Sequence, residues 1–184
     1  MSNDIDDRVF FLLMAARKVG NYLYAWGGES ADEGGFDCSG FVSISLMETA
    51  RAWPQLYDGG RQTAAGLYHY YHGKNCPDIT RTQDLKPACL LFYRNPSGSI
   101  FHVAIHAADV PALTVKDEQS GKLRSVEVGP IAFEAGGAGS TATSPREALK
   151  RNAGIRVSAS DAHTVNNTWV AKDPFILLGR GAAR

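Results

Sequence analysis

The sequence predicts an α+β fold in which helices come first along the chain and strands follow. Two observations carry this prediction. In the first half, apolar residues recur at helical spacing within residues 6–19 and 38–52. After Pro87 the period changes to that of β-strands. Because helices and strands are segregated along the chain, the pattern favours α+β over an alternating α/β sheet.

Three helical stretches are expected in the first half. Residues 6–19 form the first, and Gly20 marks its end. The second begins at about residue 38 and runs to about residue 52, before Pro54. Residues 62–71 are amphipathic and are expected to be helical or irregular.

The second half predicts mostly strands. Residues 89–93 and 102–107 are expected to pair through a turn at residues 95–98. The remaining predicted elements are strands at residues 123–128, 131–135, 155–158 and 175–178, and a short helix at residues 145–151. Because no repeat or long linker interrupts the chain, we expect one domain over residues 1–184.

Composition and charge give no support for a nucleic-acid partner or a membrane span. The 184 residues are 44% hydrophobic and 21% charged, which is ordinary for a globular protein. Nineteen basic residues balance nineteen acidic ones, so nothing favours a nucleic-acid partner. No apolar run has the length of a membrane span, and the first seven residues are polar and acidic, the reverse of a signal peptide. We therefore expect synthesis in the cytoplasm; the oligomeric state is left open.

The chain has three cysteines, Cys38, Cys76 and Cys89. An odd, sparse set without a C-x-x-C pair indicates neither a disulfide framework nor a zinc knuckle. No dense cluster of His, Cys and Asp is visible, so no metal is expected. Residues 137–142 fit a loose dinucleotide-binding pattern, but too little chain follows them for a doubly wound sheet, so no cofactor is expected either.

A glycine loop followed by a candidate nucleophile is the most informative segment. Residues 24–28 read Tyr-Ala-Trp-Gly-Gly, and residues 35–42 read Gly-Phe-Asp-Cys-Ser-Gly-Phe-Val. Asp37 and Ser39 are helix-capping residue types, which places Cys38 at or near a helix N-terminus. There the helix macrodipole favours an anion, which predicts a thiol pKa below the usual value of about 8.5. We interpret Cys38 as a nucleophile that reacts as thiolate.

A histidine on a predicted strand is the candidate base. His102, Ala104 and His106 share one face of that strand. A strand rises about 3.3 Å per residue, so the two imidazoles are separated by roughly 13 Å along it and cannot both serve Cys38. Glu134, on what is predicted to be the next core strand, is the candidate that orients the imidazole.

Four segments together resemble the NlpC family of cell-wall endopeptidases: residues 24–28, 37–40, 102–105 and 133–135. The resemblance implies a papain-like fold, in which N-terminal helices, including the nucleophile helix, pack on a small antiparallel sheet. It also implies a cysteine endopeptidase that hydrolyses peptidoglycan stem peptides, often at the bond between D-glutamate and a diamino acid.

The resemblance also implies roles for individual residues. Cys38 matches the family's nucleophile. His102 matches the family's base, and this match selects His102 rather than His106. Glu134 falls where the family has a third polar residue, usually His, Asn or Gln. The stretch at residues 109–127 is longer than the family's usual link between base and third residue.

The resemblance implies three substrate-binding residues as well. Tyr24 matches a tyrosine whose hydroxyl lies beside the nucleophile. In some family members the positions of Asp37 and Ser39 hold the free amine of the substrate.

Two other interpretations stay open. One is an amidase or acyltransferase on the same fold. The other is a non-catalytic module for wall binding or phage tail assembly, which the intact set of Cys38, His102 and Glu134 disfavours. With no visible export signal, we expect the protein to reach the cell wall by delivery, as a phage lysin or an injected effector.

Overall fold

A computed structural model describes residues 4–116, 123–137, 142–164 and 166–180. Its helices are α1 (Asp4–Ala16), α2 (Cys38–Ala50), α3 (Ala64–Gly73), α4 (Pro145–Lys150) and α5 (Ile176–Arg180), with a 3₁₀ turn at Thr82–Asp84. Its strands are β1 (Glu29–Ser30), β2 (Gly35–Phe36), β3 (Leu90–Arg94), β4 (Ile100–Lys116), β5 (Leu123–Gly136), β6 (Gly154–Ala159) and β7 (Thr168–Lys172). Within the described part, no helix is long and apolar enough to cross a membrane.

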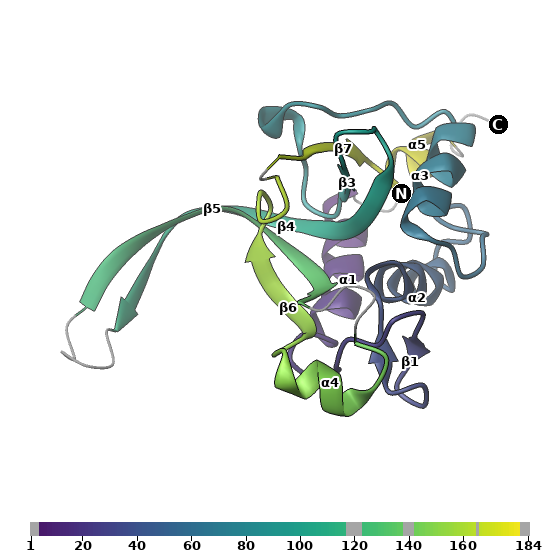
Figure 1. The fold of residues 1–184 in the computed structure, drawn as a ribbon. Helices are drawn as coiled ribbons and strands as arrows, with labels where there is room; N and C mark the ends of the chain where they lie inside the picture. Colours follow the sequence, from purple (N-terminus) through teal and green to yellow (C-terminus); the bar gives the residue numbers. More distant parts are fainter. Residues whose placement is uncertain (1–3, 117–122, 138–141, 165, 181–184) are drawn as a thin grey trace.

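The centre of the fold is a five-stranded antiparallel sheet in the order β6-β5-β4-β3-β7. β1 and β2 form a separate small hairpin within the loop that precedes α2. Figure 1 shows α1, α2 and α3 gathered beside the sheet. The predicted α+β class is therefore confirmed, with N-terminal helices against an antiparallel sheet.

Side chains alternate between the two faces of the sheet, and both faces carry a buried apolar cluster. The larger core includes Phe11 of α1, Phe41 of α2 and Val103 of β4, all fully buried. A smaller cluster on the other face includes Tyr93 and Ala104. Successive residues of β4 thus point to opposite faces, as the pleat requires.

The predicted helix starts are close to the observed ones, whereas the end of the chain differs from the prediction. The strand predicted at residues 175–178 is wrong, because this segment begins α5 and the last strand is β7. The cause is local: the Asp173 carboxylate accepts a hydrogen bond from the Phe175 N–H at 3.0 Å, and Leu178 N–H bonds the Phe175 carbonyl. A side-chain cap of this kind starts a helical turn.

A long hairpin made by β4 and β5 projects from the body of the protein (Figure 1). Its pairing runs from Lys116 opposite Leu123 down to Ile105 opposite Phe133, with an irregularity between His106 and Ala108. The two strands predicted at residues 123–128 and 131–135 are one continuous strand, β5.

Below the Ile105–Phe133 pair, the two strands of this hairpin separate. Tyr93 of β3 pairs with His102, while Glu134 and Ala135 pair with Arg156 and Ile155 of β6. The sheet therefore opens between β4 and β5 at its inner end.

Candidate active site

The start of α2 is fixed by its capping residue and by close backbone packing. Asp37 has extended backbone, and its carboxylate accepts from Gly40 N–H at 2.6 Å. A Cβ atom on Gly40 would lie only 2.2 Å from the Gly28 carbonyl oxygen, so the glycine loop can reach the first helical turn only because position 40 is glycine. This packing holds Cys38 as the first residue of α2, as predicted.

The Cys38 thiol lies against β4 where β4 separates from β5. The backbone of Val103 and of Ser39 forms hydrogen bonds with the Cys38 thiol, and both bonds favour its thiolate form. Val103 directly follows His102, so the sulfur contacts the strand next to the candidate base. Cys38 and His102 also line one cavity, which places two predicted site residues from separate parts of the chain together.

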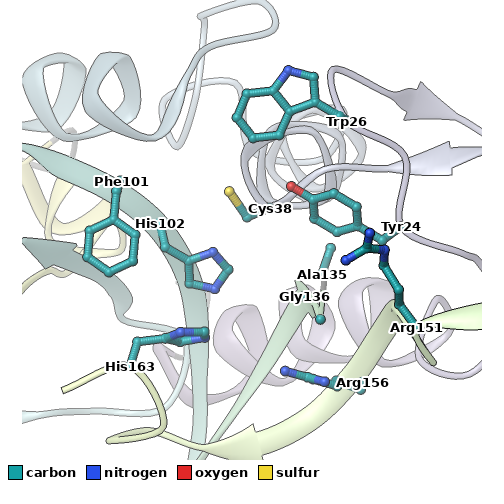
Figure 2. A pocket seen from close by; sticks show the side chains of 11 residues that line it. Tyr24, Trp26, Cys38, Phe101, His102, Ala135, Gly136, Arg151, Arg156 and His163 are labelled. Carbon is teal, nitrogen blue, oxygen red and sulfur yellow. The ribbon is translucent and has the colours of Figure 1, made fainter. Parts of the chain in front are cut away.

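The cavity has a volume of about 430 Å³. Figure 2 shows Phe101 and His163 on one side, and Tyr24 and Arg151 on the other. Its lining residues are Tyr24, Trp26, Cys38, Phe101, His102, Ala135, Gly136, Gly137, Arg151, Arg156 and His163. Trp26 and Phe101 are 57% and 45% exposed, so aromatic surface is available at the rim for a bound ligand.

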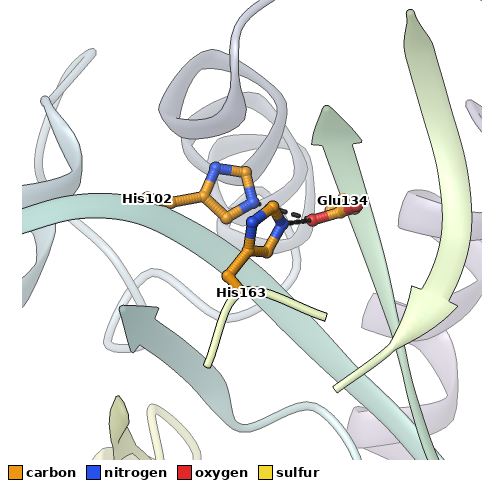
Figure 3. Close-up of side chains that lie close together, drawn as sticks. All are labelled: His102, Glu134 and His163. Atoms are coloured by element: carbon orange, nitrogen blue, oxygen red, sulfur yellow. Dashed lines mark hydrogen bonds and ion pairs between the residues drawn. The ribbon is translucent and has the colours of Figure 1, made fainter. Parts of the chain in front are cut away.

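A buried carboxylate behind this cavity joins two histidines (Figure 3) and also binds an arginine. Glu134 Oε2 lies 2.8 Å from His102 Nε2 and 2.6 Å from His163 Nε2. Its other oxygen, Oε1, accepts from Arg156 Nε at 3.0 Å and from Nη2 at 2.9 Å. Glu134 is fully buried, and this charge-assisted set satisfies both of its oxygens. His102 is thus held through Nε2, which leaves Nδ1 for exchange with a proton donor in the cavity.

The pKa directions follow from burial and these contacts. Burial raises the pKa of the Cys38 thiol to about 11, and the nearby Asp37 charge adds to the effect. The lowered thiol pKa expected from the helix start is therefore wrong, because desolvation outweighs the favourable backbone contacts. Burial lowers the pKa of His102 below 6.5 despite its bond to Glu134. Burial alone would raise the pKa of Glu134. The hydrogen bonds from His102 and His163 outweigh burial and hold this pKa well below its usual range.

Tyr24 lies where the resemblance implies. It lines the cavity, and its hydroxyl points toward Cys38 in Figure 2. Burial raises the pKa of Tyr24 above its usual range, so the hydroxyl is a proton donor at neutral pH.

Asp37 and Ser39 are engaged by the protein itself. Asp37 Oδ1 accepts from Gly40 N–H and from the Ser39 hydroxyl, the latter at 3.0 Å. Its Oδ2 accepts from Gly27 N–H at 3.1 Å and from Arg61 Nη2 at 2.5 Å, and Arg61 Nη1 also donates to Ser39 Oγ at 2.9 Å. A substrate amine would have to displace Arg61 to reach them. Their role in substrate binding stays a prediction.

Two contributors to the site, His163 and Arg156, were not predicted. Arg156 lies on β6 directly opposite Glu134, so a correct strand register would have found it. His163 lies in the loop between β6 and β7, and no periodic pattern marks it. His106, which shares a strand face with His102, is 1% exposed, and its Nδ1 lies 3.4 Å from the Ser160 hydroxyl.

His102, Glu134 and His163 also bring ligand atoms within 4.8 Å of one another, a grouping that could hold a metal ion. The expectation that the chain has no such cluster is therefore wrong. The fit to zinc is poor, however. Ligand atoms in a tetrahedral zinc site are about 3.3 Å apart, whereas Glu134 Oε2 contacts both histidines at hydrogen-bond distance. The Arg156 cation on the same carboxylate also opposes a second positive charge.

The chain matches a known protein family. A model of the NlpC/P60 family matches residues 21–129, which is more than half of the chain. The chain belongs to the NlpC/P60 family. This family is in general one of cell-wall peptidases and hydrolases. The matched region of this NlpC/P60 protein includes Cys38 and His102 and ends before Glu134. No curated protein and no solved structure matches the chain.

Proposed function

We propose that this NlpC/P60 protein is a cysteine endopeptidase that cleaves peptidoglycan stem peptides, at the bond between D-glutamate and a diamino acid. The observation that carries the proposal is the position of the Cys38 thiol, which contacts the backbone of Val103 and shares a cavity with His102. Membership of the NlpC/P60 family supports peptidoglycan as the substrate class. We also propose that the protein acts on the cell wall after delivery, as a lysin or an injected effector.

The proposed reaction begins with a neutral thiol, because the pKa of Cys38 is raised to about 11. His102 Nδ1 accepts the thiol proton as the sulfur attacks the carbonyl carbon of the scissile amide. Glu134 keeps the proton of His102 on Nε2, so Nδ1 is the basic nitrogen. In this proposal the oxyanion is stabilised by the backbone N–H of Cys38, at the start of α2, and by the hydroxyl of Tyr24, which lines the cavity.

In the second half of the reaction, His102 returns the proton to the leaving amine, and the C–N bond breaks to give a thioester on Cys38. Water, deprotonated by His102, then attacks the thioester carbonyl. This step releases the carboxylic acid product and restores the thiol. No other reactant is consumed.

The test is digestion of purified peptidoglycan, followed by mass spectrometry of the soluble fragments. We expect new fragments whose masses place the cut between D-glutamate and the diamino acid. Release of intact stem peptides from the glycan would instead indicate an amidase, and transfer of the acyl group to an added amine would indicate an acyltransferase. Binding to the wall without any cut would support the non-catalytic module.

Hydrolysis is expected to lose activity on the acid side at a pH below 6.5. His102 accepts a proton only when it is neutral, and burial lowers its folded pKa below 6.5. The neutral form of His102 therefore predominates at pH 7 and is lost as the pH falls through the folded pKa. The measurement is kcat/KM from pH 4.5 to 8, with the folded state checked at each pH. An acid limb centred above pH 6.5 would contradict this protonation scheme.

Glu134→Gln is expected to slow turnover less than His102→Ala does, and to destabilise the fold. The amide can accept from one neighbour, but its NH₂ then faces another donor, because three donating side chains converge on this position. An unsatisfied buried group costs about 1–3 kcal/mol. Kinetics and thermal unfolding would measure both effects, with Glu33→Gln on the exposed loop as the matched control.

This stability difference should depend on pH in a defined direction. The folded pKa of Glu134 is depressed, so its stabilising contribution is present above the unfolded pKa of about 4.3 and is lost as the pH falls toward the folded value. The gap in Tm between wild type and Glu134→Gln should therefore narrow below pH 4.3. A gap that widens on acidification would mean that the carboxylate is not ionised in the folded protein.

A chelator is expected to leave activity unchanged. The histidines and Glu134 are joined by direct hydrogen bonds shorter than the ligand spacing of a zinc site. The measurement is hydrolysis before and after treatment with EDTA and with 1,10-phenanthroline. Activity that is lost on chelation and returns with Zn²⁺ would replace the thiol mechanism with metal-dependent hydrolysis.

A further inference from the structure

The charge lining the cavity is one-sided. Arg151 and Arg156 both line it, whereas the residues lining it within the described part include no aspartate or glutamate. Glu134 lies behind the wall and is fully buried. We propose that Arg151 and Arg156 form a subsite for a free carboxylate that flanks the scissile bond. This inference rests on the proposed peptidase function. It adds a preference for substrates with a free carboxylate beside the scissile bond.

Arg151 is the cation available to a ligand. It follows the last residue of α4, its side chain is exposed, and no ion pair or side-chain hydrogen bond is found for it among the described residues. Figure 2 shows its guanidinium beside Tyr24 at the rim of the cavity, on the side away from Phe101. An arginine fork matches the two oxygens of a carboxylate, which makes Arg151 a suitable first contact.

Arg156 is held in place by the protein. Its Nε and Nη2 both donate to Glu134 Oε1, so the guanidinium has a fixed orientation. The third nitrogen, Nη1, faces Gly137, where a Cβ atom would lie only 3.3 Å away. Gly137 is itself a lining residue of the cavity, so Nη1 is presented toward the space that a substrate would fill.

Stem peptides can supply such a carboxylate in two places. A D-glutamyl residue linked through its side chain keeps a free α-carboxylate close to the scissile amide, and the diamino acid on the other side can carry another. Amidation of either group removes its charge while changing its size very little. The subsite therefore predicts discrimination between amidated and non-amidated stem peptides.

The experiment compares three synthetic stem peptides that differ in one group: both carboxylates free, the D-glutamyl α-carboxylate amidated, and the diamino-acid carboxylate amidated. For the wild-type protein we expect kcat/KM to fall about tenfold or more when the recognised carboxylate is amidated, as for loss of one charged hydrogen bond. The amidated peptide whose kcat/KM falls identifies which carboxylate is bound.

Arg151→Ala is expected to remove most of this discrimination by raising KM for the free carboxylate, with kcat little changed. Arg151→Lys should restore part of it. Lys150→Ala removes the same charge from the exposed neighbouring position, which does not line the cavity, and should behave as wild type.

The outcomes separate the two proposals. If the wild type cleaves none of the three peptides, the proposed function fails. If it cleaves all three with equal kcat/KM, the function stands and the carboxylate subsite is overturned. If discrimination survives in Arg151→Ala, Arg151 does not form the subsite.

Discussion

Replacement of Cys38 by alanine is expected to reduce peptidoglycan hydrolysis by several orders of magnitude while the protein stays folded. The thiol sulfur is the atom proposed to form the thioester, and no other thiol lines the cavity among the described residues. Cys38 is 9% exposed at the first position of α2, so loss of one sulfur atom leaves the Asp37 cap and the glycine packing intact. Cys38→Ser should be similarly inactive, since a hydroxyl is a much weaker acid than a thiol.

The measurement pairs hydrolysis rates with thermal unfolding, and Cys76→Ala serves as the matched control. Cys76 is buried away from the cavity, so this variant should keep wild-type turnover. Iodoacetamide should modify Cys38 before Cys76 and Cys89, with a rate that rises with pH because the pKa of the Cys38 thiol is about 11. Activity near wild type in folded Cys38→Ala would overturn the proposed mechanism.

His102→Ala is expected to reduce turnover almost as strongly, whereas His106→Ala should leave kcat nearly unchanged. His102 lines the cavity and is hydrogen-bonded to Glu134. His106 does not line it, and its ring contacts Ser160 instead. Because burial lowers the pKa of His102, its removal takes away a proton acceptor rather than a positive charge.

The two histidine variants must be compared per folded molecule. His106 is 1% exposed, so its truncation should lower the free energy of unfolding by about 1–3 kcal/mol even though turnover persists. Circular dichroism and thermal unfolding give the folded fraction, and initial rates give kcat. An inactive, folded His106→Ala together with an active His102→Ala would reverse the assignment of the base.

Local sequence rules predicted the centre of the site because its geometry is local. Asp37 caps the helix that Cys38 begins, and the glycines of the preceding loop allow the close approach at Gly40. The strand that carries His102 was also visible from its alternation. Glu134 was proposed as the partner of His102 because it lies on the next predicted core strand, and the structure gives the hydrogen bond between them.

The features that were not predicted depend on tertiary contacts, which no local sequence pattern encodes. His163 reaches Glu134 from a loop, 29 residues farther along the chain. The direction of the Cys38 pKa could not be obtained from the helix start alone, because the burial that dominates it comes from the sheet and the cavity wall. At the chain end, the apolar run after Asp173 fits a strand as well as a helix, and the side-chain cap decided the outcome.

The β4–β5 hairpin brings together residues that lie far apart along the chain. His102 and Glu134 lie at its inner end and are in direct contact, although 31 residues intervene between them. The outer part, where Lys116 pairs with Leu123, projects away from the body (Figure 1). Residues can therefore be gained or lost there in evolution, two at a time to preserve the pleat, without moving the inner end. The hairpin is a place where relatives can diverge in length while sharing the same chemistry.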